Sequence, residues 1–443
     1  MSDSAWTGAA VAAVTAGYAL ISGRLTMTAV STPMVFTGVG VAIGPAGLGL
    51  LDLESDAGPV LTLVEAALTL VLFTGATSIR RRDLRLGGFL AGRLLGIGLP
   101  LTIGAGWLLA WPLLPGLTLW ELALLGAVLA PTDAALGKTA VSDPRVPTMV
   151  RGGLNVESGL NDGMALPFYV LFLAALPGTT AAEEGADGVF WRALVLSSAW
   201  GMAVGGLGGW LLRRCGERGW VSRDWRQTFV LAVAVGAYTL AAATEGSGFI
   251  AAWVAGFAFD VSLRRAVPAG APAHTRTADD GTVDLAGHLA ELLASLSFLV
   301  FGAVLLGPAL EGLDWRIIAY AVLSLTMIRM LPVALCLAGS GLALPTVFYI
   351  GWFGPRGLAS VVFGLLLVEE QHVPGMELLG RVIAVTVALS ILLHGMSAVA
   401  LAKRYGAWYR KAAERRPGLR EGVPEDGEAT HSSTSTARQG DDG

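Results

Sequence analysis

The sequence predicts an all-α protein that crosses a membrane about thirteen times. Hydrophobic residues make up 54% of its 443 residues and charged residues only 14%, against roughly 25% charged in a typical soluble domain. Apolar stretches of about 20 residues, the length of a bilayer-spanning helix, recur from Ala5 to Ala402, and the charges lie mostly at the joints between them. This pattern leaves no room for a sizeable soluble domain.

Three of the predicted spans have distinctive features. The first follows a segment that contains Asp3 and no Lys or Arg, so it lacks the basic start of a signal peptide and is expected to be a retained helix. The fifth contains Pro131, and residues 351–357, with three glycines and a proline, interrupt the twelfth. The thirteen spans are predicted at residues 5–22, 31–46, 59–78, 86–110, 118–137, 152–175, 189–212, 227–243, 247–262, 284–307, 315–338, 344–368 and 378–402.

Charges at the joints predict the orientation. Cytoplasmic loops are enriched in Lys and Arg, and basic residues fall on alternate joints while the intervening joints are short or acidic. We therefore expect a multi-pass protein of a bacterial-type plasma membrane, with its N-terminus outside and its C-terminus in the cytoplasm, which requires an odd number of spans. The basic joints contain Arg24, Arg80 to Arg82 with Arg85, Lys138 with Arg145 and Arg151, Arg213 and Arg214 with Arg218, Arg223 and Arg226, Arg264 and Arg265, and Lys403 and Arg404.

Composition also divides the chain. Residues 1–404 are predicted to form the transmembrane domain, with core and dimerisation parts interleaved, and residues 405–443 a polar, disordered cytoplasmic tail. The loop 268–284, rich in Ala, Thr, Pro and Asp, is expected to be flexible and cytoplasmic. Cys215 and Cys336 show no paired spacing, and no basic surface suggests nucleic acid.

The two interrupted spans point to a transport site. Proline removes a backbone hydrogen bond, and irregular backbone is tolerated at membrane depth only inside protein or around a cavity. Interrupted helices in corresponding halves of a chain are the best sequence indicator of a transporter's binding site. Fifth and twelfth is the offset expected for two six-helix repeats joined by one linking span.

Polar residues gather beside the first of these breaks. A charged side chain at the bilayer centre costs roughly 2.5–3.5 kcal/mol on insertion scales, so carboxylates there are functional by default. Carboxylate, hydroxyl, amide and carbonyl oxygens are the ligands of a small hard cation, and the same carboxylates also bind protons. The alternatives are a structural role for Asp162 and a helix-end role for Asp133. The candidate residues are Thr132, Asp133, Glu157, Ser158, Asn161 and Asp162.

Arg356 is a single basic residue at the second break. An unpaired guanidinium at that depth is expensive, so we expect a structural ion pair with Glu157, which would leave Asp162 free to exchange ions. The alternative is an Arg356 side chain that snorkels from the mouth of a cytoplasmic cavity.

Other apparent motifs do not indicate chemistry. Gly137-Lys138-Thr139 ends like a P-loop, but the first required glycine position is Thr132 and no strand precedes it. The five histidines are scattered and make no metal-ligand pair. The glycine-rich segment 205–209 is expected to permit close helix packing rather than ligand binding.

The motifs around these residues resemble those of the monovalent cation:proton antiporter-1 family, the NhaP-type prokaryotic sodium/proton antiporters related to animal sodium/hydrogen exchangers. The likeness rests on Thr132-Asp133, on Glu157-Ser158 followed by Asn161-Asp162-Gly163, and on Gly354-Pro355-Arg356-Gly357. It implies a NhaA/NapA/NhaP-like fold of inverted six-helix repeats with two unwound, crossing helices, a homodimer, and elevator-like alternating access.

The resemblance also implies site roles. Asp162 would bind the cation and the proton, with Thr132, Asp133 and Ser158 as further ligands. Asn161 would be a supporting residue, and Glu157 would pair with Arg356. Many relatives carry an acidic residue shortly after the Leu-Phe of the third span, where this chain reads Leu72-Phe73-Thr74-Gly75-Ala76. The ion's identity is therefore left open.

The prediction is a secondary antiporter, not an enzyme, that exchanges Na⁺, with K⁺ or Li⁺ as alternatives, for H⁺ across the lipid bilayer. Cation and proton would compete for Asp162 without any cofactor, and exchange is expected to be electroneutral. The rival interpretations are a cation channel, which would more plausibly show a repeated filter motif, and a membrane-embedded enzyme, which would need a nucleophile–base pair or a metal cluster.

Overall fold

The computed structural model describes residues 2–25, 28, 30–49, 53–79, 81–133, 136, 143–176, 186–264, 282–369, 375–416 and 418–422. Within these ranges every regular element is a helix. Each of the thirteen predicted spans coincides with one helix or with consecutive helical segments, and eight described segments are long and apolar enough to cross a membrane. The predicted fold class is confirmed.

The first half of the chain begins with long helices and reaches the first break after a short one. The helices are α1 (Ser2–Leu25), α2 (Thr32–Ile43), α3 (Leu53–Thr77), α4 (Arg81–Arg93), η1 (Leu94–Gly98), α5 (Leu99–Leu113), α6 (Leu119–Val128), α8 (Thr148–Ala174), α10 (Ala186–Glu217), α11 (Arg223–Ala243) and α12 (Gly248–Arg264).

The second half contains more interrupted helices. Its elements are α14 (Asp284–Phe301), η2 (Gly302–Leu306), α15 (Gly307–Glu311), α16 (Trp315–Leu325), α17 (Met327–Cys336), α18 (Leu344–Trp352), α19 (Leu358–Glu369), α20 (Met376–Arg415) and η3 (Arg420–Gly422).

Local sequence explains two recurring features of these helices. The π-helical segments η1 and η2 lie just before Pro100 and Pro308, where the proline ring and its missing N–H disturb the regular ladder. The helix α6 starts with a capping box, in which Thr118 and Glu121 each satisfy a backbone N–H of the other.

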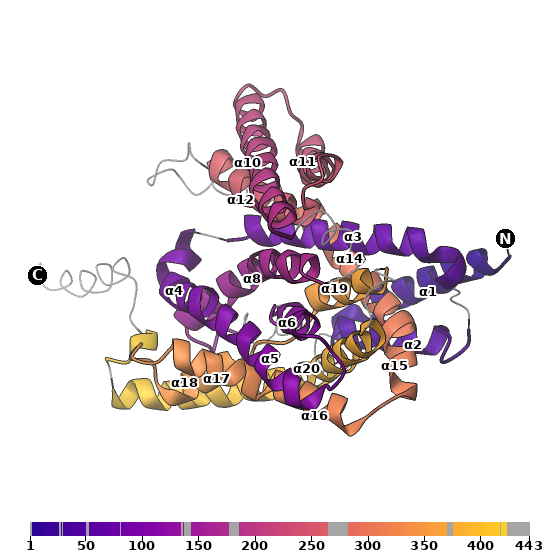
Figure 1. The fold of residues 1–443 in the computed structure, drawn as a ribbon. Coiled ribbons are helices and arrows are strands. Elements are labelled where there is room, and N and C mark those ends of the chain that lie inside the picture. The colour runs from indigo at the N-terminus through magenta and orange to yellow at the C-terminus, as the bar shows by residue number, and fades with distance from the viewer. Residues whose placement is uncertain are drawn as a thin grey trace, which may run out of the picture.

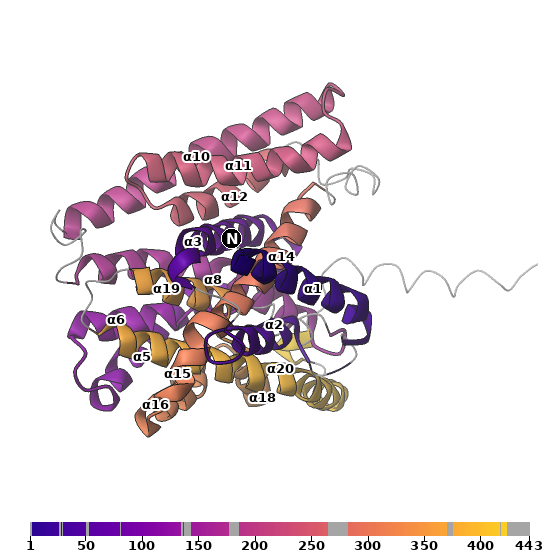
Figure 2. The same cartoon turned by 90° about the vertical axis from the view of Figure 1, so that its right-hand side faces the viewer.

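Helices α10, α11 and α12 form a layer of their own on α3, as both views show (Figures 1 and 2). Glycines at every fourth position of α10 make this packing close. A Cβ on Gly201, Gly205 or Gly209 would overlap a backbone carbonyl oxygen of α12. The glycine-rich segment is therefore a packing surface, as predicted.

The last helix continues beyond the predicted domain boundary at residue 404. It runs to Arg415, and the Tyr405 ring is buried against Tyr349, with the ring centroids 4.3 Å apart. Glu421 is also buried, where its Oε1 accepts hydrogen bonds from the Ala343 N–H at 2.8 Å and the Thr346 hydroxyl at 2.7 Å. The structured part thus includes residues of the predicted tail. Residues 423–443 and most of the 268–284 loop lie outside the described residues.

Candidate ion-binding site

Both predicted interruptions are present. The helix α6 ends at Val128, and residues 131–133 are non-helical. The helix α18 ends at Trp352, and non-helical backbone leads through residues 353–357 to the start of α19 at Leu358. Pro131 and Pro355 lie within these breaks, where neither can donate a backbone hydrogen bond.

The two breaks cross and hydrogen-bond to each other. The Asp133 N–H donates to the Pro355 carbonyl at 2.8 Å, and the Ser360 hydroxyl donates to the Val128 carbonyl at 2.7 Å. Backbone groups released by one break are therefore satisfied by the other, as burial requires. We call the segments 129–133 and 353–357 together the crossing.

Asp133 caps the second half-helix at this crossing. Its Oδ2 accepts a hydrogen bond from the Leu358 N–H at 3.1 Å, at the N-terminal end of α19 where the helix dipole favours a negative charge. Gly357 makes the approach possible, because a Cβ there would overlap the Asp133 side chain. The helix-end alternative for Asp133 is thus what the geometry shows.

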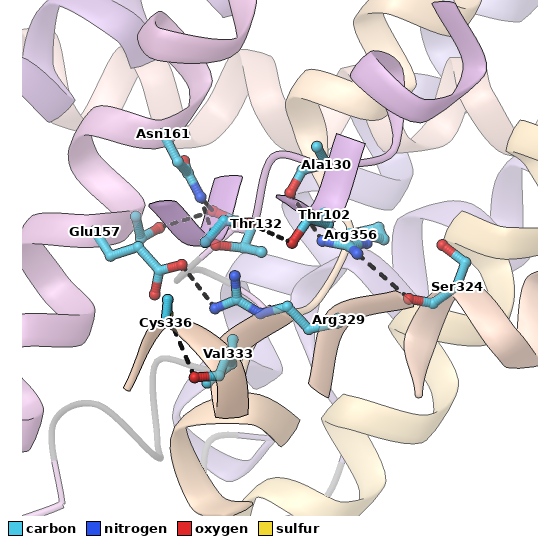
Figure 3. Close-up of polar contacts among 12 residues, drawn as sticks. Thr102, Ala130, Thr132, Glu157, Asn161, Ser324, Arg329, Val333, Cys336 and Arg356 are labelled. Carbon is cyan, nitrogen blue, oxygen red and sulfur yellow. Dashed lines mark hydrogen bonds and ion pairs between the residues drawn. The ribbon is translucent and has the colours of Figure 1, made fainter. Parts of the chain in front are cut away.

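Helix α8 brings the polar residues of the sixth span to the crossing. The Ser158 hydroxyl and the Asn161 amide both donate to the Thr132 carbonyl, at 3.1 and 3.0 Å, and the Asn161 amide also contacts the Thr132 hydroxyl (Figure 3). The predicted gathering of Thr132, Ser158 and Asn161 is confirmed. These bonds tie α8 to the first break.

Asp162 follows on the same helix and is buried, with 9% of its surface exposed. Its Oδ1, like the Asn161 Oδ1, has no hydrogen-bond donor among the described residues. A buried acceptor without a partner costs free energy, more so when it carries charge. A proton or a cation would relieve that cost. Gly163, the next residue, lies against the Trp253 indole of α12, where a Cβ would overlap the ring.

The predicted Glu157–Arg356 ion pair is wrong. Glu157 pairs instead with Arg329 of α17, with Arg329 Nη2 2.7 Å from Glu157 Oε1 and both side chains 3% exposed (Figure 3). Sequence reasoning missed Arg329, although a single arginine in the apolar eleventh span carries the same signal as Arg356 in the twelfth. A search for every isolated charge within the spans would have found it.

Arg356 is held by backbone carbonyls. It is fully buried, which excludes snorkelling, and its guanidinium donates to the Ala130 carbonyl at 2.9 Å and to the Ser324 carbonyl at 3.3 Å (Figure 3). Its own N–H donates to the Ser390 hydroxyl at 2.7 Å. Since Ala130 belongs to the first break, Arg356 connects the two halves of the crossing.

Broken helices that cross beside buried carboxylates define the class of helical transport proteins. The chain belongs to the sodium/hydrogen exchanger family, because the family model for the transmembrane region matches residues 10–404. This is a family of secondary transporters, which confirms the predicted family and the prediction that the chain is not an enzyme.

Named relatives agree with this assignment. The chain is 26% identical over 408 residues to a K⁺/H⁺ antiporter NhaP of Alkalimonas amylolytica, with 90% of this chain and 66% of the relative covered. It is also 26% identical over 345 residues to the Na⁺/H⁺ antiporter 2 of Zygosaccharomyces rouxii, with 68% of this chain and 41% of the relative covered. The chain thus spans less than two thirds of these proteins.

A solved structure shares the fold. The sodium proton antiporter MjNhaP1 of Methanocaldococcus jannaschii superimposes with a TM-score of 0.75, covering 92% of this chain and 99% of that one, at 19% identity.

Proposed function

We propose that this protein is a secondary antiporter that exchanges a monovalent cation for a proton at Asp162. The observation that carries the proposal is the buried Asp162 carboxylate, whose Oδ1 has no donor among the described residues and which lies beside the crossing. The family membership and the antiporter relatives support it.

The mechanism needs one rule, which is that cation and proton compete for the same carboxylate. An empty, ionised Asp162 is costly to carry through a membrane-depth barrier, whereas the carboxylate neutralised by either ligand is not. The site can then move between the two faces only when loaded. Thr132 and Ser158 supply neutral oxygens nearby, as a hard monovalent cation requires.

Na⁺ or K⁺ is the proposed cation, with Li⁺ as a further alternative. The relatives include both Na⁺/H⁺ and K⁺/H⁺ antiporters, and the third span of this chain carries Thr74 and Gly75 rather than an acid. Proton flux in proteoliposomes, driven by gradients of each ion in turn, identifies the substrate. Equal flux with every ion, or flux without countertransport, would favour a channel.

Exchange of one cation for one proton follows from a single exchangeable carboxylate. Asp133 caps α19, so its negative charge is stabilised and it is not expected to carry a second proton. Exchange at clamped membrane potential tests this, since one net charge moved through 100 mV is worth about 2.3 kcal/mol. A reversal point that shifts with voltage would contradict electroneutrality.

The test of the site itself is Asp162→Asn. This variant keeps the volume and removes the exchangeable charge, so we expect a folded protein without cation-driven proton flux. Asp260→Asn is the matched control, because Asp260 lies on α12 and pairs with Arg264 at 2.5 Å. Normal exchange by Asp162→Asn would disprove the proposed site.

We also propose a homodimer in a bacterial-type plasma membrane, with the N-terminus outside and the C-terminus in the cytoplasm. The alternation of basic joints supports the orientation, and the dimer follows from the family resemblance. Labelling of a cysteine introduced at Lys403 from one side of the membrane tests the first, and light scattering of the purified protein tests the second.

A further inference from the structure

A cavity of about 230 Å³ lies between α18 and α20, away from the crossing's carboxylates. Its walls are mostly aromatic and aliphatic, with Phe348 and Trp352 contributed by α18 and Leu401 and Trp408 by α20. Phe348 is 58% exposed, so the cavity opens as a groove on the outside of the helical bundle. The one charged residue in its lining is Arg404.

A basic helix face continues from this groove. Arg404, Trp408, Lys411 and Arg415 follow one another at spacings of four, three and four residues, which places them on one side of α20. The three basic side chains are exposed. Residues 403–416 contain six basic residues against the single acid Glu414, so the region attracts anions.

We propose that this groove binds an anionic phospholipid, with an acyl chain between α18 and α20 and the phosphate on Arg404 and Lys411. An arginine binds a phosphate through paired, charge-assisted hydrogen bonds. In the topology proposed above, this end of α20 meets the cytoplasmic leaflet, which carries the anionic lipids and where basic pockets between helices bind their head groups. Tryptophan side chains favour the same depth.

A lipid fits this groove better than the other occupants available. Residues 423–443 contain no aromatic residue and no Leu, Ile or Met that could fill an aromatic groove. A helix from a second copy would pack with its axis 8–10 Å from its neighbours, which needs a wider surface than this narrow cavity. A linear acyl chain needs only the space between two helices.

The groove reaches the crossing through α18. Trp352 is the last residue of that helix, and its Nε1 donates to the Ser397 hydroxyl of α20 at 3.0 Å. Phe353, the first residue of the second break, also lines the groove. A bound acyl chain would therefore pack against the segment that leads into the ion site and raise the thermal stability of the protein.

The test compares lipids on the purified full chain in detergent. Native mass spectrometry and thermal unfolding are measured with phosphatidylglycerol, with phosphatidylcholine of the same chains, and with glycerol phosphate alone. We expect phosphatidylglycerol to be retained and to raise the unfolding temperature, with little effect of the other two. Neither readout requires transport, so their failure is distinct from failure of the proposed antiport.

Two variants locate the site. Arg404→Gln should weaken retention of phosphatidylglycerol about tenfold, since a charge-assisted bond to the phosphate is lost. Lys403→Gln is the matched control, because it removes the same charge at a neighbouring position that does not line the groove. Leu401→Trp should reduce retention by narrowing the groove while leaving Arg404 in place.

Three outcomes would overturn the proposal. Equal stabilisation by both lipids would indicate only an apolar annulus, and equal losses in Arg404→Gln and Lys403→Gln would indicate only a diffuse basic surface. Retention that appears only after residues 423–443 are deleted, or that disappears when the protein associates, would show that the chain itself occupies the groove.

Discussion

The crossing and the α10–α12 surface both bring two backbones into close approach, but by opposite means. On α10, glycines such as Gly205 remove side chains and leave both helices intact. At the crossing the helices are broken, so backbone groups are released and must be satisfied by side chains such as Asp133 and Arg356. Glycine packing creates only contact, whereas broken helices create polar groups that can hold charge.

This contrast predicts that damage near the crossing depends on charge. Glu157→Gln or Arg329→Gln alone leaves a buried charge without its partner, which typically costs about 3–5 kcal/mol, while replacing both partners is much less destabilising. A double-mutant cycle of unfolding free energies measures the difference. Additive losses would break the comparison, because the pair would then act as two independent residues.

The Gly205 contact predicts a smaller and purely steric effect. Gly205→Ala places a Cβ against the Ala255 carbonyl oxygen and should destabilise the fold by about 1–3 kcal/mol, as overpacking does. Transport per folded molecule should be unchanged. Gly206→Ala is the control, since its Cβ would meet only the Ser262 hydroxyl at 3.8 Å. A transport defect in folded Gly205→Ala would show that this surface takes part in exchange.

A glycine at the crossing should behave in the reverse way. Gly357→Ala displaces the Asp133 carboxylate from the start of α19, so we expect exchange to fall about tenfold for a lost charge-assisted cap, roughly 1–2 kcal/mol. Stability should fall by less than in Gly205→Ala. Gly104→Ala on α5, where the Cβ meets open space, controls for the added methyl group. Normal exchange by folded Gly357→Ala would remove Asp133 from the ion site.

The smallest effect concerns a carboxylate outside the membrane spans. Hydrogen bonds from the Arg145 guanidinium, the shorter at 2.6 Å, hold the pKa of Asp143 below its usual value. A lowered pKa means that this carboxylate stabilises the fold above its unfolded pKa, and that the gain is lost as the pH falls through its folded pKa.

Asp143→Asn should remove that part of the acid dependence and cost no more than about 1 kcal/mol, because the Arg145 side chain is 40% exposed. Unfolding temperatures between pH 3 and pH 7 would show it. An Asp143 effect as large as that of Glu157 would mean that burial is not what makes charge at the crossing expensive.

The sequence by itself determined the helices and the place of the site. Thirteen apolar runs and two interruptions were visible because hydropathy and proline act locally. Ser158, Asn161 and Asp162 lie on one stretch of helix, so their common position followed from helical spacing. Glycines on α10 likewise showed a packing surface by their spacing alone.

Tertiary structure alone decided how the buried charges are balanced. Glu157 could pair with either buried arginine as far as charge is concerned, and only the packing of α17 beside α8 selects Arg329. Arg356 is satisfied by carbonyls of residues 32 and 226 positions away. Likewise α20 continues past residue 404 because Tyr405 packs on distant α18. Composition records which groups must be satisfied, but the choice among partners depends on distances that arise only when the helices pack.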